Sequence, residues 1–266
     1  MNYKKIKILT VILVFVFLLG CLKDKNDTKD QLPSLDGKKV LMVYGGWDGH
    51  QPDVFVGKVS KWLYAEGAQL VISDSLGVYT NKKIMETIDV IIQYWTMGEL
   101  TKDQFRGLEN AVKRGVGLAG CHGGLADSFR KNPEYQYMIG GQWVEHPGGE
   151  IDYKVSIVDT NDAITHRIKD FTMKNTEQYY MHIDPNIKVL ATTKFTDSIH
   201  PWIKDRVIPV AWKTYYGDGR IFYLSIGHKP IDFNTTEAKQ LLLRGIRWAS
   251  GSKYNPKENT LQSVYD

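Results

Sequence analysis

The sequence predicts an α/β fold built on a doubly wound, mostly parallel β-sheet. The apolar run Lys39–Tyr44 ends in two glycines, which is the pattern of a strand buried on both faces and followed by a sharp turn. Strand and helix patterns then alternate as far as residue 119, which implies right-handed crossovers. The 266 residues are 42% apolar and 24% charged, values typical of a globular chain and not of a disordered or multi-span membrane protein.

The first half of the chain supplies the parallel strands. The expected strands are Lys39–Tyr44, Gln69–Ile72, Ile88–Gln93 and Val116–Ala119. A helix over Asp53–Glu66 has apolar residues at helical spacing and stops before Gly67. A second helix over Thr101–Lys113 opens with a threonine cap.

The second half has shorter, partly alternating strands, which predict extra β-hairpin elements. These strands are Ile151–Val158, Val189–Thr193, Val207–Trp212 and Gly219–Ile226. The glycine-rich segment 215–219 is the expected hairpin turn between the last two. A closing helix spans Thr235–Ala249, and residues 252–266 form a polar tail. Because composition does not shift within residues 38–251, we expect one domain there.

Residues 1–20 have the features of a lipoprotein signal peptide. Three lysines precede Ile8–Leu19, an apolar stretch too short for the ~20 residues that a membrane span needs. Leu18-Leu19-Gly20-Cys21 resembles the bacterial lipobox, so Cys21 is the expected lipidation site. The alternative is a signal cleaved elsewhere that leaves Cys21 as a free thiol.

Anchoring by Cys21 predicts a protein of the bacterial cell envelope, attached to a membrane on its periplasmic or surface side. Residues 21–37 are polar, mixed in charge and interrupted by Pro33, so we expect a flexible tether. Removing the three lysines of residues 1–20 lowers the formal net charge from +4 to 4 − 3 = +1. A nearly neutral mature chain lacks the charge of a nucleic-acid-binding protein.

Three histidines follow predicted strands of the sheet. His50 lies in a glycine-rich turn after the first strand, His122 follows the fourth, and His228 follows the last. Ligands of doubly wound sheets bind at the carboxyl ends of the strands. We therefore expect the three imidazoles to share one site, although each alone could be an ordinary histidine satisfied by backbone groups.

The segment 120–124, Gly-Cys-His-Gly-Gly, predicts a tight turn from strand to helix. Such an elbow needs small residues two positions before and after the residue it presents. Glycines occupy both positions only when the elbow is centred on His122; centred on Cys121, the first position is Ala119. The elbow therefore presents a histidine, and Cys121 is expected to be a small buried residue. This weakens an amidotransferase or peptidase assignment, which needs a nucleophile there.

Together, several motifs resemble the ThuA-like (trehalose utilisation) family of the class I glutamine amidotransferase-like superfamily, over about residues 38–251. They are the turn with His50, Gly-x-His with His122, Trp143-x-x-His146-Pro147, Thr176-Glu177-Gln178-Tyr179, Pro209–Trp212, Gly217–Tyr223 and Gly227-His228. The chain departs from the family at 162–165, where Asp-Ala replaces a frequent His-Pro, so no role passes to His166.

The resemblance implies a flavodoxin-like three-layer α/β/α sandwich and a small-molecule carbohydrate ligand, including disaccharides and oxidised (3-keto) sugars. Aromatic rings can stack on sugar faces, and His or Glu can move protons. The expected site residues are, for catalysis, His122, Glu177 and His228, and for substrate binding, His50, Trp47, His146, Trp212 and Tyr180. The tryptophans could equally be core residues.

Two mechanisms and two other functions stay open at this point. His122 and Glu177 could act as acid and base, or His50, His122 and His228, with or without His146, could bind a divalent metal such as zinc. The other functions are a non-catalytic sugar-binding lipoprotein and an amidase that uses Cys121.

Overall fold

The computed structural model describes residues 32–196, 200–255 and 257, which form one unit with its own core. The predicted signal peptide, Cys21 and most of the tether lie outside the described residues. No helix in the described ranges is long and apolar enough to cross a membrane.

A nine-stranded sheet forms the centre of this unit, with the order β2-β1-β3-β4-β11-β10-β9-β6-β7. Its strands are β1 (Lys39–Gly46), β2 (Gln69–Ser73), β3 (Val90–Thr96), β4 (Gly117–Cys121), β6 (Glu150–Ile157), β7 (Phe171–Glu177), β9 (Lys188–Lys194), β10 (Val207–Tyr216) and β11 (Gly219–Leu224). Neighbours from β2 to β11 pair in parallel, and neighbours from β11 to β7 pair antiparallel. The predicted parallel sheet and hairpin elements are both confirmed.

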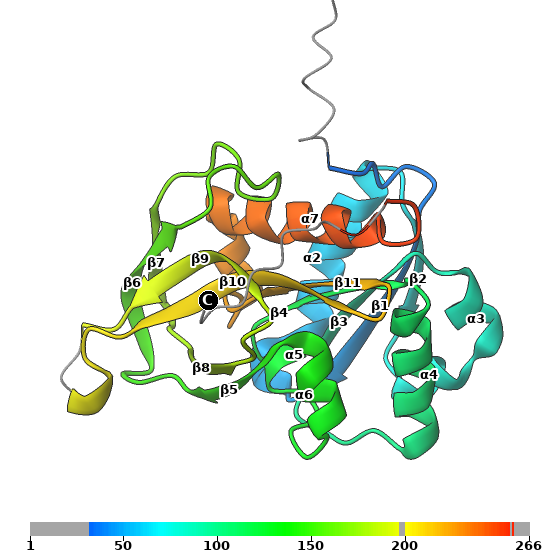
Figure 1. Ribbon diagram of the computed structural model, residues 1–266, viewed down its shortest axis with the longest axis horizontal. Coiled ribbons are helices and arrows are strands. Elements are labelled where there is room, and N and C mark those ends of the chain that lie inside the picture. The colour runs from blue at the N-terminus through cyan, green and yellow to red at the C-terminus, as the bar shows by residue number, and fades with distance from the viewer. Residues whose placement is uncertain (1–31, 197–199, 256, 258–266) are drawn as a thin grey trace, which may run out of the picture. The chain divides into compact units, whose positions relative to one another are not determined.

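Helices cover both faces of the sheet, which makes three layers (Figure 1). One face carries α2 (Pro52–Ala65) and α7 (Thr236–Ser250); the other carries α3 (Lys82–Thr87), α4 (Lys102–Lys113), α5 (Gly123–Ala126) and α6 (Pro133–Ile139). The predicted flavodoxin-like sandwich is confirmed.

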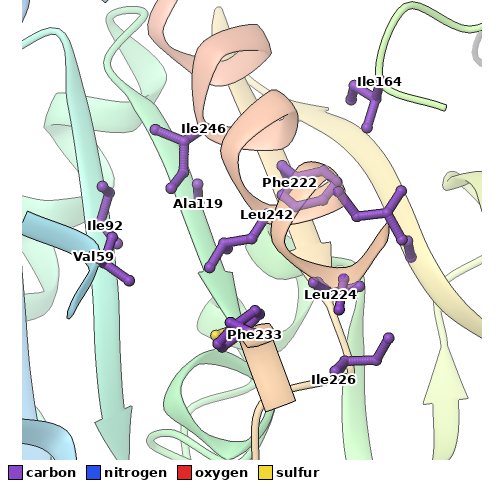
Figure 2. Close-up of a cluster of buried hydrophobic side chains, with 14 of the residues drawn as sticks. Val59, Ile92, Ala119, Ile164, Phe222, Leu224, Ile226, Phe233, Leu242 and Ile246 are labelled. Atoms are coloured by element: carbon purple, nitrogen blue, oxygen red, sulfur yellow. The ribbon is translucent and has the colours of Figure 1, made fainter. Parts of the chain in front are cut away.

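Alternate residues of the central strands enter two separate cores, as the strand period of two requires. Ile92 and Phe222 join the core under α2 and α7, together with Leu242 and Phe233 (Figure 2). Their neighbours along the same strands, Ile91 and Tyr223, pack under α4 to α6. The sheet is therefore apolar on both faces, which explains the continuous apolar runs in the sequence.

Several short elements were not predicted. They are the strands β7 and β8 (Tyr180–Ile183), the strand β5 (Gly141–Glu145), the helices α3 and α6, and the 3₁₀ segments η1 (Asp48–His50), η2 (Leu76–Thr80), η3 (Pro201–Ile203) and η4 (Pro230–Asn234). β5 and β8 pair antiparallel in a small second sheet. Elements of three to seven residues are too short to show a period, so tertiary packing decides them.

The compact unit extends past both predicted limits, 38 and 251. Leu35 is fully buried, and the Arg247 side chain donates hydrogen bonds to the backbone oxygens of residues 32 and 33. At the other end, the Tyr254 hydroxyl donates to Asp89 Oδ1 at 2.6 Å. The polar residues on either side of the predicted domain are thus partly fixed by contacts that polarity alone does not reveal.

Candidate functional site

The three histidines that follow predicted strands converge at the carboxyl edge of the parallel strands. His50 ends η1 after β1, His122 follows β4, and His228 follows β11, and these strands lie close together in the sheet. Their ring centroids are 4.7 Å (His50 to His122), 5.4 Å (His50 to His228) and 5.6 Å (His122 to His228) apart. The three imidazoles, which were expected to share one site, therefore lie together.

The predicted elbow at His122 is also confirmed. His122 has φ 51° and ψ −145°, a strained conformation for a residue with a side chain, between β4 and α5. A Cβ at Gly120 would lie 2.6 Å from the Gln93 backbone oxygen, and one at Gly124 would lie 2.8 Å from the Tyr94 Cα. Only glycine fits both positions, so the turn can bring His122 over the end of the sheet.

Cys121 cannot serve as the nucleophile in this arrangement. Its side chain is fully buried, and burial, together with Asp232, raises the pKa of its thiol well above the ordinary value. A protonated thiol without access to solvent is inert. This agrees with its prediction as a small core residue and removes support for a thiol-dependent amidase.

Glu177 completes the cluster from the far edge of the sheet. Its Oε2 lies 3.0 Å from His122 Nε2 and 3.3 Å from His228 Nδ1, and its Oε1 lies 3.5 Å from His146 Nε2. The side chains of His50, His122, Glu177 and His228 are all buried, and one ligand atom from each lies within 4.8 Å of the others.

Bending of the antiparallel half of the sheet brings Glu177 to this position. Strand β7 is four places from β11 in the strand order, and the β10–β9 and β6–β7 pairings both contain register shifts. Asn175, at φ 47°, turns the end of the strand. The Thr176 hydroxyl then donates a hydrogen bond of 2.8 Å to Asp232 Oδ2, which fixes the strand end to η4, just after His228.

Burial and charge divide the protonation states within the cluster. Burial, with the nearby His122 and His228, lowers the pKa of His50 to about 2. Burial lowers the pKa of His122, against the opposing effect of Glu177. Burial also disfavours protonation of His228, but the Glu177 carboxylate outweighs it and raises the His228 pKa. Burial likewise opposes ionisation of Glu177, yet His122 and His228 hold its pKa below the ordinary value.

Each imidazole is oriented by a polar partner outside the cluster. His122 Nδ1 donates to the Ser225 backbone oxygen at 2.8 Å, and His50 Nδ1 lies 2.7 Å from the Thr96 hydroxyl. His228 Nε2 lies 3.4 Å from Glu150 Oε1. One nitrogen of each ring is thus held from outside, which fixes the ring's orientation.

These supporting groups are not among the residues that the sequence predicts at the site. Thr96 ends β3 at the same edge as the histidines, so its position at a strand end was a usable signal. Tyr179 stacks on His122 with ring centroids 3.9 Å apart, and it belongs to the Thr176-Glu177-Gln178-Tyr179 motif. Glu150 and the Ser225 carbonyl gave no signal, because a charged residue at a strand start and a backbone oxygen are ordinary features.

Two predicted binding residues lie beside the cluster. Trp47 contacts His50 edge-on, with centroids 4.7 Å apart, and 47% of Trp47 is exposed. His146 reaches Glu177, and its side chain is 35% exposed. These two rings connect the buried cluster to the surface.

Trp212 is a correction. It is fully buried, its Nε1 donates to the Ile139 backbone oxygen at 2.9 Å, and it packs on Tyr223 in the core under α6. Its expected role was to stack on a sugar face, but its side chain is buried in the layer interior. The alternative of a core tryptophan is the correct one.

Tyr180 lies in a surface groove next to the cluster. The groove, of about 410 Å³, lies between the β5–β8 sheet and η3, and its walls are Val144, Glu145, Pro147, Tyr180, His182, His200, Trp202 and Ile203. Glu145 and Pro147 flank His146, whose ring reaches Glu177. His146 therefore stands between the groove and the buried cluster.

The Asp162–Thr165 segment has a structural role. Asp162 Oδ2 lies 2.6 Å from Lys213 Nζ and 3.0 Å from Lys188 Nζ, and Asp162 Oδ1 accepts from the Ile164 backbone N–H at 3.0 Å. The segment is fixed by buried charges and does not contribute to the histidine cluster. His166 is exposed and outside it.

Comparisons with known proteins agree with this architecture. The model of the trehalose utilisation family, ThuA, matches residues 39–249. Solved structures with a similar fold include a protein described as ThuA-like from Bacteroides uniformis ATCC 8492, with 19% identity and a TM-score of 0.66 over 82% of this chain and 92% of that chain. Another ThuA-like protein, from Parabacteroides merdae ATCC 43184, has 16% identity and a TM-score of 0.68 over 84% and 93%.

A cytoplasmic protein from Salmonella typhimurium LT2 has 13% identity and a TM-score of 0.54 over 80% of this chain and 98% of that chain. At these identities the structural matches show the fold alone. No curated protein matches the chain.

Proposed function

The chain belongs to the ThuA family of trehalose utilisation, and on that basis we propose that it is an enzyme acting on a disaccharide or an oxidised (3-keto) sugar. The family supports a carbohydrate-related role. The observation that carries the proposal is one buried carboxylate, Glu177, held by His122, His228 and His146 at the carboxyl edge of the parallel strands.

The cluster suits proton transfer on a sugar next to a carbonyl. A 3-keto group acidifies the neighbouring C–H, so elimination or isomerisation needs one group to accept that proton and another to donate one. Glu177 and His228 lie 3.3 Å apart and form the acid–base pair. The hydrogen bond from His122 Nδ1 to Ser225 keeps the His122 Nε2 directed at Glu177.

Substrate reaches Glu177 and His228 from the surface, where the exposed Trp47 ring lies. Trp47, with nearly half of its surface exposed, offers a face on which a sugar ring can stack, and His50 lies beside it. The second ring of a disaccharide occupies the groove with Tyr180 and Trp202, because His146 joins the groove to Glu177. Trp202 is 73% exposed, as a stacking residue in an open groove needs to be.

The proposal is tested by incubating the protein with a panel of 3-keto and unoxidised disaccharides and following the products by chromatography. We expect turnover of at least one sugar, and its loss in Glu177→Gln, which keeps the shape and removes the charge. Glu99→Gln is the matched control, because Glu99 pairs with Lys131 and its side chain is 68% exposed. Equal activity in both variants would remove Glu177 from the chemistry.

A non-catalytic sugar-binding protein is the second candidate. The observation in its favour is the elbow, which carries His122 where amidotransferase-like enzymes need a nucleophile, while the thiol of Cys121 is buried. Calorimetric binding of a panel sugar that is recovered unchanged after long incubation identifies this function. A thiol alkylator under native conditions should leave either function intact.

We also propose that the protein is a lipoprotein of the bacterial cell envelope, anchored through Cys21. The proposal rests on the sequence of residues 1–21. The compact unit begins at Leu32, so residues 22–31 separate it from the lipid attachment point.

A further inference from the structure

The four buried side chains at the carboxyl edge have an arrangement that proton transfer alone does not require. His122 Nδ1 faces a backbone carbonyl, which can only accept a hydrogen bond, so the Nδ1 carries the ring proton. In the neutral ring, Nε2 then has a lone pair, and it lies 3.0 Å from Glu177 Oε2. Two acceptors face each other at this distance, and only a positive charge between them makes the contact favourable.

His228 presents a second ring nitrogen, without a hydrogen-bond partner in the described part of the chain, to the same Glu177 oxygen. Its Nδ1 is buried and makes no hydrogen bond among the described residues, although Glu177 Oε2 is 3.3 Å away. A buried polar nitrogen without a partner costs stability unless an ion or water satisfies it. When both rings are neutral, with the proton on the nitrogen that faces Ser225 or Glu150, His122 and His228 thus direct acceptor atoms at the same place as Glu177.

The outer nitrogens of all three rings are occupied. His50 is held through Thr96, His122 through Ser225, and His228 through Glu150. Histidines that bind metals characteristically contact a carboxylate, carbonyl or hydroxyl through the nitrogen that does not bind the ion. The inner nitrogens are left to coordinate.

The spacing of the inner atoms suits a small ion. Zinc lies about 2.0–2.1 Å from nitrogen ligands, so its tetrahedral ligand atoms are about 3.3 Å apart. The distances from Glu177 Oε2 to His122 and His228, 3.0 and 3.3 Å, already agree. All four ligand atoms lie within 4.8 Å of one another, so the widest pair closes by a small side-chain movement.

Gly123 keeps space open at the same place. A Cβ on Gly123 would lie 2.6 Å from His50 Cε1, so any other residue would displace this ring from the cluster. Gly123 directly follows the strained residue His122, and the turn therefore positions one ring while leaving room for the other.

We propose that His50, His122, Glu177 and His228 bind one divalent transition-metal ion, for which zinc is the best match. Three imidazoles and one carboxylate suit zinc and its neighbours, whereas magnesium and calcium prefer oxygen ligands throughout. The site deepens the proposed function, because a bound ion polarises a sugar carbonyl as a Lewis acid. When Glu177 and His228 serve as ligands they no longer act as the acid–base pair, and His146, whose Nε2 lies 3.5 Å from Glu177 Oε1, takes over the proton transfer.

Zinc itself is the probe for the test. The purified full chain is stripped with a chelator and titrated with zinc in competition with a chromogenic chelator, and elemental analysis counts the ions per chain. We expect one equivalent, an affinity at least 100-fold weaker in His50→Gln and in Glu177→Gln, and unchanged affinity in the control His166→Gln. Thr96→Val, which removes only the partner of His50 Nδ1, should weaken binding by about 10- to 100-fold.

Cobalt(II) bound to the wild-type chain gives a second measurement that needs no variant. Visible absorption bands of four- or five-coordinate cobalt with nitrogen and oxygen ligands are expected. Failure to bind either ion, zinc affinity that survives the His50 and Glu177 substitutions, or a stripped protein whose His122 carries both ring protons would overturn the proposal.

The outcomes also separate the metal site from the enzyme activity. Zinc binding at this site without turnover of any sugar would support the metal site and contradict the proposed enzyme activity. Full turnover by the stripped protein would support the enzyme activity and remove the metal from its mechanism, and the zinc titration would then decide metal binding separately.

Discussion

Asp162 forms a deeply buried ion pair, and its substitution gives a quantitative prediction. Asp162 Oδ2 contacts the Nζ atoms of Lys213 and Lys188, and the side chains of Asp162 and Lys213 are each 3% exposed. Asp162→Asn replaces the charged carboxylate with a neutral amide. Either the amide NH₂ or the uncharged amide oxygen then faces the two ammonium groups. Removing one partner of a buried pair costs about 3 kcal/mol or more.

This loss is large enough to measure by urea or thermal unfolding. At about 2–4 °C per kcal/mol for a unit of this size, Tm should fall by about 6–12 °C. The matched control is Asp205→Asn, because Asp205 pairs with Lys194 at 2.9 Å with both side chains more than half exposed. Such a surface pair contributes less than about 1 kcal/mol. Equal destabilisation by the two substitutions would refute the reasoning.

The stability difference between wild type and Asp162→Asn should also depend on pH, in a direction that the Asp162 pKa predicts. Burial opposes ionisation of Asp162, but Lys213, the Ile164 amide and Lys188 outweigh it and hold its pKa below the ordinary value of 3.8. A carboxyl with a lowered folded-state pKa stabilises the protein above its unfolded-state pKa and loses this effect as the pH falls. The gap between wild type and Asp162→Asn should thus be constant from about pH 8 to 5 and shrink only below about pH 4. A gap that widens on acidification contradicts the assignment.

Two further predictions concern the core and the anchor. Gly245→Ala places a Cβ 2.1 Å from the Phe222 ring and should cost about 1–3 kcal/mol, whereas Gly57→Ala, with nothing within 4 Å, should stabilise α2 by up to about 1 kcal/mol in the same unfolding assay. Stabilisation by Gly245→Ala, or the same effect from both substitutions, would show that the α7 contact is not tight. Cys21→Ala should release the protein from the membrane fraction or leave its signal uncleaved, and unchanged fractionation with normal cleavage would argue against the lipid anchor.

The sequence determined the sheet, the elbow and the histidines because these depend on local patterns. Continuous apolar runs predicted buried parallel strands, and a parallel sheet places its carboxyl ends together, so His50, His122 and His228 could be assigned to one edge. The glycines at 120 and 124 likewise placed His122, and not Cys121, at the apex of the turn.

The tertiary structure alone decided how Glu177 meets those histidines and where Trp212 lies. Glu177 lies on β7, at one end of the strand order, yet its Oε2 is 3.0 Å from His122 Nε2. Register shifts, the turn at Asn175 and the Thr176–Asp232 hydrogen bond contribute to this approach. Trp212 lies in one of the motifs that resemble the ThuA-like family, but its side chain is in the core. Strand curvature and side-chain direction arise from contacts between residues far apart in the chain, so no local period in the sequence encodes them.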